Sequence, residues 1–303
     1  MALLAALAAA GITQHGAAHD HVGALLSDVG AGDPASTAPG VRAVAFSSDG
    51  ELLASAYSDG TIRLWNPATD QVDGPVLAAA SPAGADAVAF SPDGTLLASG
   101  YGDGIVRLWN PATGQAARPP VQTGQGSANA VAFSPDGTLL ASGYGDGIVR
   151  LWNPATGQAT GPPLQGGQAG QGSANALAFS PDGDLLAVAY GDGTVRLWNP
   201  ATGKAAGSPM QAGGGGTDGV NALAFSPDGK LLASGYSDGA IRLWNPAAGR
   251  HGGLTGDDWL IITASVVAIV LAVLTVVVTT REIRPPSRWL PSLGRRLWRS
   301  CCW

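Results

Sequence analysis

Histidine and carboxylate side chains gather in one short stretch of this sequence, at His15, His19, Asp20 and His21. If the stretch were helical, His15 and His19 would lie one turn apart on one face, and imidazole and carboxylate ligands suit zinc or nickel. Nothing downstream completes such a site, and the stretch belongs to an Ala- and Gly-rich leader. We therefore expect solvated side chains here, with no bound metal or other cofactor.

Catalytic chemistry finds little support elsewhere in the chain. Asp182 and Asp184 flank Gly183, but this is an ordinary hairpin turn with one extra acid. The two cysteines, Cys301 and Cys302, are neighbours and cannot cross-link distant segments; we expect a reduced pair, with lipid attachment as the alternative. No nucleophile with a base and no phosphate-binding loop is visible, so we expect a protein that is not an enzyme. Catalytic groups assembled from distant segments would escape this scan.

A repeat positions most of the remaining polar and aromatic side chains. The phenylalanines lie at 46, 90, 133, 179 and 225, and a tryptophan follows each of them 19 residues later. Successive units are 43 to 46 residues apart. Because only the connection after Trp varies in length, the segment from Phe to Trp is typical of hydrogen-bonded strands joined by fixed turns.

Each unit predicts three good strands and one weak strand. In the second unit an apolar segment ends at Phe90 and meets the turn Ser91-Pro92-Asp93-Gly94, in which Pro and Gly favour a hairpin. Strands over 96–101 and 105–109 flank the Asp103-Gly104 turn, and a proline-containing stretch follows. Proline confines that fourth strand to an edge of the sheet.

These motifs resemble the WD40 repeat family over residues 41–250. The Phe-Ser-Pro-Asp-Gly turn (Ser48 replaces Pro in the first unit), the Asp-Gly turn and the Leu-Trp-Asn ending recur five times in order. The resemblance implies an all-β fold, a β-propeller of about five blades, and a role in binding proteins. It also implies structural roles for Trp65, Trp109, Trp152, Trp198 and Trp244, and for Asp59, Asp103, Asp146, Asp192 and Asp238.

The family's hydrogen-bond network is incomplete in this sequence. Its serine corresponds to Ser55, Ser99, Ser142 and Ser234, but the fourth unit has Val188 there, and no unit has the family's histidine. We expect backbone amides or water to replace the imidazole as partners of the turn Asp.

Two further positions recur in every unit. A tyrosine lies two residues before each turn Asp, where it either forms an aromatic ring on one face or packs between blades, and packing is favoured.

The position four residues before each Phe would lie on the innermost strand and line the channel or its rim, either as a plain polar lining or as a partner-binding rim. Its occupants are Arg42, Asp86, Asn129, Asn175 and Asn221. The residues just before each turn Asp, which this family often uses for partner contacts, are all Ser or Gly, which leaves that face without large anchors.

Closure of the propeller is left open by the sequence. After Trp244 the expected outer strand is replaced by a Gly-rich stretch. Either residues 20–40 supply that strand, or the ring is open, or two chains complete each other by self-association.

A predicted transmembrane helix follows the repeats. Residues 259–280 contain no charge, and 22 helical residues would span about 33 Å, enough for a hydrocarbon core of about 30 Å. Six arginines follow it, so by the positive-inside bias the tail is cytoplasmic. The N-terminal ten residues have an apolar run without the basic flank of a signal peptide, which leaves the side occupied by the propeller open.

The charge distribution excludes one class of partner. Residues 1–258 carry 10 Lys and Arg against 21 Asp and Glu, and nucleic-acid binding usually requires a basic patch.

We expect a membrane-anchored, non-catalytic scaffold for protein partners, with a remnant sensor of a multidomain signalling protein or a small-ligand-binding propeller as alternatives. The predicted parts are an N-terminal segment that is disordered or completes a blade (1–40), the propeller (41–250), a linker (251–258), the helix (259–280) and an Arg-rich tail (281–303).

Overall fold

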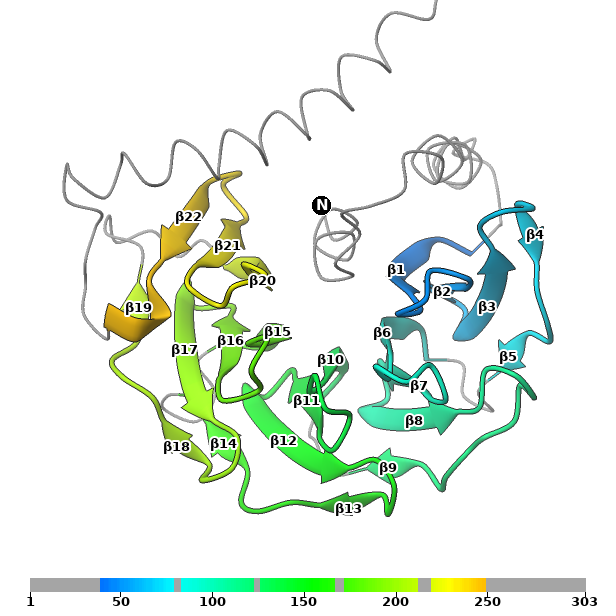
Figure 1. The fold of residues 1–303 in the computed structure, drawn as a ribbon, viewed down its shortest axis with the longest axis horizontal. Coiled ribbons are helices and arrows are strands. Elements are labelled where there is room, and N and C mark those ends of the chain that lie inside the picture. Colours follow the sequence, from blue (N-terminus) through cyan, green and yellow to red (C-terminus); the bar gives the residue numbers. More distant parts are fainter. Residues whose placement is uncertain (1–38, 79–82, 123–125, 167–171, 212–218, 249–303) are drawn as a thin grey trace, which may run out of the picture. The chain divides into compact units, whose positions relative to one another are not determined.

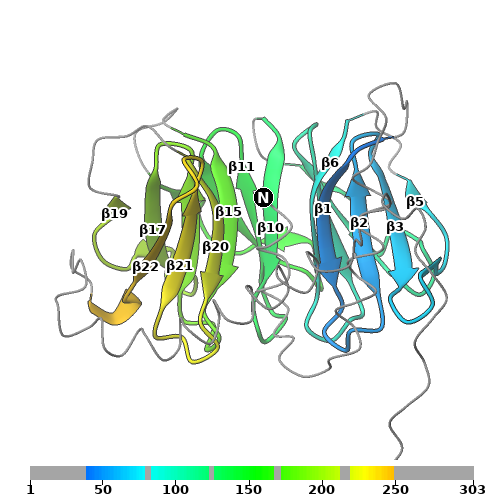
Figure 2. The same ribbon diagram turned by 90° about the horizontal axis from the view of Figure 1, so that it is seen from above.

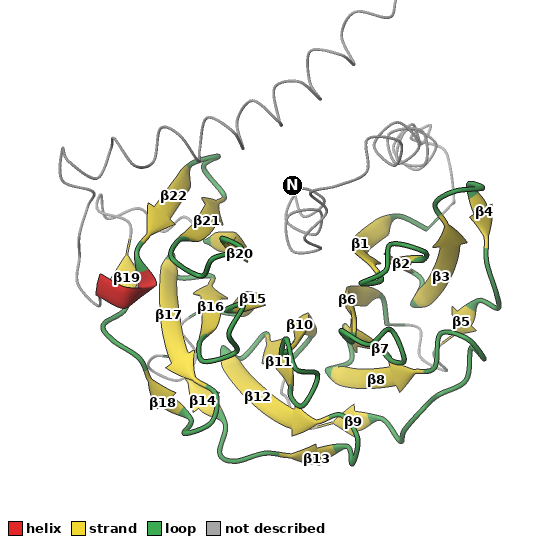
Figure 3. Cartoon of the chain, viewed as in Figure 1, coloured by secondary structure: helices red, strands yellow, loops and turns green. Residues whose placement is uncertain are grey.

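The computed structural model describes residues 39–78, 83–122, 126–166, 172–211 and 219–248. These residues form five antiparallel β-sheets and one 3-10 turn, η1 (Pro246–Ala248), which confirms the predicted all-β class (Figure 1, Figure 3). The chain divides into residues 1–252, which hold all five sheets, and residues 253–303. The leader with its histidines, the predicted helix 259–280 and the Arg-rich tail lie outside the described residues.

Each sheet is one repeat unit, here called a blade, and its strands follow sequence order from the inside outward. Blade 1 contains β1 (Val41–Phe46), β2 (Leu53–Tyr57), β3 (Thr61–Asn66), β4 (Gln71–Val72) and β5 (Leu77–Ala78). Blade 2 contains β6 (Ala85–Phe90), β7 (Leu97–Tyr101), β8 (Ile105–Trp109) and β9 (Val121–Gln122). Blade 3 contains β10 (Ala128–Phe133), β11 (Leu140–Tyr144), β12 (Ile148–Asn153), β13 (Gln158–Ala159) and β14 (Leu164–Gln165). Blade 4 contains β15 (Ala174–Phe179), β16 (Leu186–Tyr190), β17 (Thr194–Asn199), β18 (Lys204–Ala205) and β19 (Met210–Gln211). Blade 5 contains β20 (Val220–Phe225), β21 (Leu232–Tyr236) and β22 (Ile241–Trp244).

The weak fourth strand of the prediction is confirmed as an edge element, and it is interrupted. In blade 3 both β13 and β14 pair with β12, and Pro162 and Pro163 lie between them. Because proline cannot donate to a ladder, pairing stops there and resumes. Blades 1 and 4 repeat this arrangement.

The turns follow the predicted chemistry. In blade 2 the amide of Gly94 donates to the carbonyl of Ser91 at 2.9 Å, and Gly94 has a positive φ of 70°, which glycine adopts at little cost. The hydroxyl of Ser91 donates to Asp93 Oδ1 at 2.5 Å and accepts from the amide of Leu96 at 2.9 Å. Hydrogen bonds of the Ser91 side chain therefore stabilise the hairpin in addition to the backbone bond of Gly94.

The core lies between the blades. Each blade has a leading face, formed in blade 1 by Ala54, Ala56, Ile62 and Leu64, and a trailing face, formed in blade 2 by Leu97, Tyr101 and Trp109. The leading face of blade 1 packs on the trailing face of blade 2, and equivalent residues pack blade 2 on 3, blade 3 on 4 and blade 4 on 5. All five tyrosines are buried. Four of them, Tyr101, Tyr144, Tyr190 and Tyr236, lie in the clusters between blades, which confirms for these four the prediction that they pack there.

The strands of all five blades run between the same two faces of this part of the chain (Figure 2). The edge of the face at which the inner strands begin is called the rim below. The turn between the second and third strands lies there as well, because Val41 at the start of β1 pairs with Tyr57 at the end of β2.

Candidate partner-binding rim

The five positions predicted to line the channel share one backbone feature. In every blade the register between the first and second strands shifts by one residue. The extra residue is the candidate itself: in blade 1, Val41 pairs with Tyr57 and Ala43 with Ala56, which leaves Arg42 unpaired in the ladder. A β-bulge re-aims the side chain that it carries. The bulged residues, called the rim residues below, are Arg42, Asp86, Asn129, Asn175 and Asn221.

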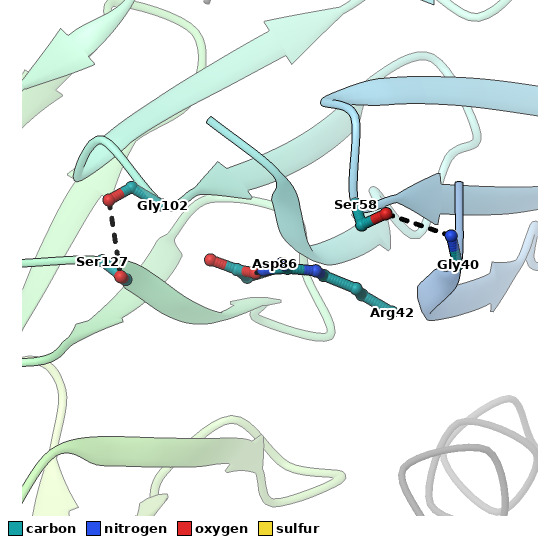
Figure 4. A network of polar contacts seen from close by, with 6 residues as sticks. All are labelled: Gly40, Arg42, Ser58, Asp86, Gly102 and Ser127. Atoms are coloured by element: carbon teal, nitrogen blue, oxygen red, sulfur yellow. Dashed lines mark hydrogen bonds and ion pairs between the residues drawn. The ribbon is translucent and has the colours of Figure 1, made fainter. Parts of the chain in front are cut away.

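The first two rim residues form an ion pair between neighbouring blades. The Arg42 Nη1 group donates to Asp86 Oδ1, so the inner strands of blades 1 and 2 are joined across the rim (Figure 4). Gly84 makes room for this pair, because a Cβ at that position would lie 2.9 Å from Arg42 Cζ. Since the Arg42 side chain is nearly half exposed, the pair contributes at most about 1 kcal/mol and remains open to exchange for a partner group.

The other rim residues carry amides. Asn175 Nδ2 donates to the backbone carbonyl of Val220 in the next blade at 3.2 Å, and the Ser173 hydroxyl donates to Asn175 Oδ1. Asn129 is half-buried and Asn221 is exposed. An amide can both donate and accept hydrogen bonds, so this half of the rim suits backbone or polar side-chain groups of either kind.

Small residues, Ser or Gly, lie beside the rim residues at the position before each turn Asp. The residue before each turn Asp donates its amide to the chain just before the inner strand of the same blade, as from Gly102 to Gly84 O at 2.9 Å and from Gly145 to Ser127 O at 2.9 Å. The Ser127 hydroxyl in turn donates to Gly102 O in the preceding blade at 3.4 Å (Figure 4). Because these positions carry only Ser or Gly, they offer mainly polar and backbone groups beside the rim residues.

The predicted structural residues form hydrogen bonds within their own blades. The indole Nε1 of Trp152 donates to Ser142 Oγ at 2.8 Å, and the Trp–Ser pairs of blades 1, 2 and 5 repeat this bond at 2.7 to 2.8 Å. In blade 4, where Val188 replaces the serine, no described residue accepts a well-formed hydrogen bond from the buried Trp198 Nε1. Burial raises the pKa of the neighbouring Tyr190 to about 12, against smaller lowering effects of Arg196 and the Trp198 indole.

The turn aspartates cap their hairpins with backbone amides, as expected in the absence of the histidine. Asp103 Oδ1 accepts from the amide of Ile105 at 3.0 Å, and Asp59 Oδ1 accepts from both the amide and the hydroxyl of Thr61. The amide of Thr61 is the main cause that lowers the pKa of Asp59. The equivalent carboxylates Asp146, Asp192 and Asp238 accept the same amide bond.

An arginine that recurs in every unit was not among the predicted site residues. It lies two residues before each Trp, and this spacing places it on the trailing face beside the tyrosine. The guanidinium of Arg107 lies 4.4 Å from the centre of the Tyr101 ring and donates to Asp103 Oδ2 at 3.4 Å. Arg63 and Arg242 stack in the same way on Tyr57 and Tyr236. In these three blades a stacked cation therefore packs on the buried tyrosine.

The described residues contain neither a group of metal ligands nor a membrane-spanning helix. Within them, no three His, Cys, Asp or Glu side chains are grouped so as to hold a metal ion. None of the described segments is a helix of the length and apolarity needed to cross a membrane.

Comparison with known proteins supports the repeat assignment. The family model "WD domain, G-beta repeat" matches five segments, 33–66, 73–110, 118–153, 164–199 and 207–245, which together make up more than half of the chain. A search of curated proteins found no match. Each matched segment ends at or within one residue of the Trp-Asn that closes the third strand of a blade. The chain therefore belongs to the WD40 repeat family.

Proposed function

We propose that this protein is a non-catalytic scaffold, anchored in a membrane by residues 259–280, whose rim binds a protein partner. WD40 repeats are generally protein-interaction modules. The observation that carries the proposal is the row of five bulged rim residues, which presents one cation, one carboxylate and three amides on one face.

The chemistry of the rim indicates the kind of partner. Apolar anchors are lacking there, so the partner supplies the large side chains that dominate most interfaces. Its polar groups bond to the amides of Asn129, Asn175 and Asn221, while a charged pair can exchange with Arg42 and Asp86. An extended peptide segment rich in backbone donors and acceptors fits this pattern, whereas a nucleic acid does not, because the domain is acidic.

The membrane part of the proposal rests on sequence. The charge-free stretch 259–280 is followed by six arginines, which favours a cytoplasmic tail. A scaffold fixed to a membrane searches for its partner over a surface, so weak rim contacts suffice when several copies lie together.

Photo-crosslinking from the rim tests the proposal. A photoreactive amino acid is placed at Asn221 in the full chain and, in a matched variant, at Lys204, which is exposed on the outer strand β18. We expect irradiation of cells to join the Asn221 variant, and not the Lys204 variant, to a discrete polypeptide. Equal products from both positions, or none from Asn221, would contradict a partner-binding rim. A thermal shift of the protein with small metabolites in the absence of such a polypeptide would favour the small-ligand alternative.

A further inference from the structure

The leading face of blade 5 is uncovered, although it repeats a face that is buried in every other blade. Ile241 is 77% exposed. The residues at the same position of the third strand in the other blades are all 0% exposed: Ile62, Val106, Val149 and Val195. Leu243 and Ala233 are half-buried, whereas their counterparts in blades 1 to 4 are buried.

The surroundings of Gly235, on the same face of blade 5, differ from those of the equivalent glycines in blades 2 and 3. A Cβ built on Gly100 would lie 2.4 Å from Ala128 O of the following blade, and one on Gly143 would lie 3.0 Å from Ala174 Cβ. Among the described residues, a Cβ on Gly235 would meet only Ala222 of its own blade, at 3.5 Å. No described residue of another blade therefore contacts this position in blade 5, as one does in blades 2 and 3.

The trailing face of blade 1 is its complement and is uncovered in part, although Leu53 and Tyr57 on that face are buried. Val41 is half-buried, while the residues that replace it in blades 2 to 5 are 0% exposed. Trp65 is half-buried, as Trp244 is, whereas Trp109, Trp152 and Trp198 are buried. Val41 is therefore the clearer sign that this face lacks a neighbour. Because Ile241 is exposed and Val41 is only half-buried in the same molecule, blades 1 and 5 of one chain do not cover each other at these positions.

The chain itself contains no other segment with the required side chains. Four interfaces inside the chain join an Ala/Gly–Val/Ile–Leu face to a Leu–Tyr–Trp face. Residues 1–38 contain no Phe, Tyr or Trp, and residues 249–303 contain no Tyr. Among the described residues, the one free face of the right kind is that of blade 1, and a second molecule can supply it.

We propose that blade 5 of one copy packs on blade 1 of a second copy, through the interface that the chain already makes four times between its own blades. The contact is head-to-tail, so each copy uses two different faces, and association continues until the ring of copies closes. These faces are distinct from the rim, so this inference stands whether or not the rim binds a partner.

The copy number of the full chain, purified in detergent and measured by native mass spectrometry, tests this contact. We expect complexes of two or more 30.2 kDa chains for the wild type and a single chain for Ile241→Asp. Val76→Asp changes another exposed apolar residue and should leave the wild-type complexes intact. A monomeric wild type, or an Ile241→Asp protein that keeps the wild-type copy number, overturns the proposal; the latter also identifies association through other segments, such as 259–280.

Cross-linking between differently tagged chains provides a second readout. In a Cys301→Ser/Cys302→Ser background, chains with Val41→Cys are mixed with chains with Ile241→Cys and treated with a short bismaleimide. We expect a product that carries both tags, and far less product from either variant alone. If the mixture yields no such product, or if a chain with both cysteines links only within itself, the proposed contact between copies is wrong.

Discussion

Val188 in blade 4 lies at the position that Ser142 occupies in blade 3. There the Ser142 hydroxyl accepts a hydrogen bond from Trp152 Nε1. As a result the Trp198 Nε1 group is buried without a well-formed hydrogen bond among the described residues, while its counterpart donates at 2.8 Å. The Tyr190 hydroxyl is the remaining, poorly placed partner of this indole; burial raises the Tyr190 pKa, and the indole lowers it in part. A buried donor that lost its partner altogether would cost about 1–3 kcal/mol, so a poor partner costs part of that. Blade 4 therefore carries a local defect that a single substitution can repair.

Val188→Thr is expected to leave the free energy of unfolding unchanged or raise it by up to about 1 kcal/mol, because the new hydroxyl can accept from Trp198 Nε1. Val195→Thr is the matched control, since Val195 is equally buried in the same blade but lies on the apolar leading face. That control should lose about 1–3 kcal/mol. Chemical denaturation followed by tryptophan fluorescence measures both, and equal losses would show that Trp198 gains no partner.

Trp152→Ala is expected to destabilise the repeat domain by about 3–5 kcal/mol, because a buried Trp leaves a large cavity. Trp65→Ala should cost clearly less when both changes are made in the Ile241→Asp protein, whose copies stay apart, since Trp65 is half-buried in the single chain. Urea denaturation compares the two variants. A loss below about 1 kcal/mol for Trp152→Ala would mean that the blade core lies elsewhere.

Stability is expected to fall in acid because of the Asp residues in the inner hairpin turns. The hydroxyl of Ser91 and the amide of Thr95 lower the pKa of Asp93, and Ser134 and Thr138 do the same for Asp136. A carboxyl group with a lower pKa in the folded state stabilises the fold above its unfolded pKa, near 3.9, and loses that contribution as the pH falls through the folded pKa. Asp93→Asn/Asp136→Asn should reduce the slope of stability against pH between about pH 5 and pH 2, whereas an unchanged slope would assign acid sensitivity to other groups.

Much of the blade could be predicted from the sequence, because it rests on local signals. Turn chemistry at Ser91–Gly94 and a constant Phe-to-Trp distance define the strands. The bulge at Arg42 could not be predicted, since a shift of one residue in the ladder leaves no mark in composition. The stack of Arg107 on Tyr101 was missed, although the spacing of two between Arg107 and Trp109 was a sufficient signal. Exposure of Ile241 depends on whether distant blades meet, which no local pattern specifies.

The membrane orientation is expected to follow the charge bias of the tail. With residues 281–303 in the cytoplasm, a single span at 259–280 places the repeat domain outside. Protease added to intact cells should then degrade the domain while a C-terminal tag survives. Full protection of the domain would overturn this orientation, and release of the protein by alkaline extraction would contradict the anchor itself.

Affinity for the polypeptide captured at Asn221 tests the partner-binding rim most directly. Titration of the full chain in detergent with that polypeptide should show that Arg42→Ala and Asn221→Ala each weaken binding by about fivefold to thirtyfold, equivalent to about 1–2 kcal/mol. Lys204→Ala, exposed on the outer strand, should bind as the wild type does. Wild-type affinity in both rim variants would contradict a partner-binding rim and move the interface to another surface of the blades.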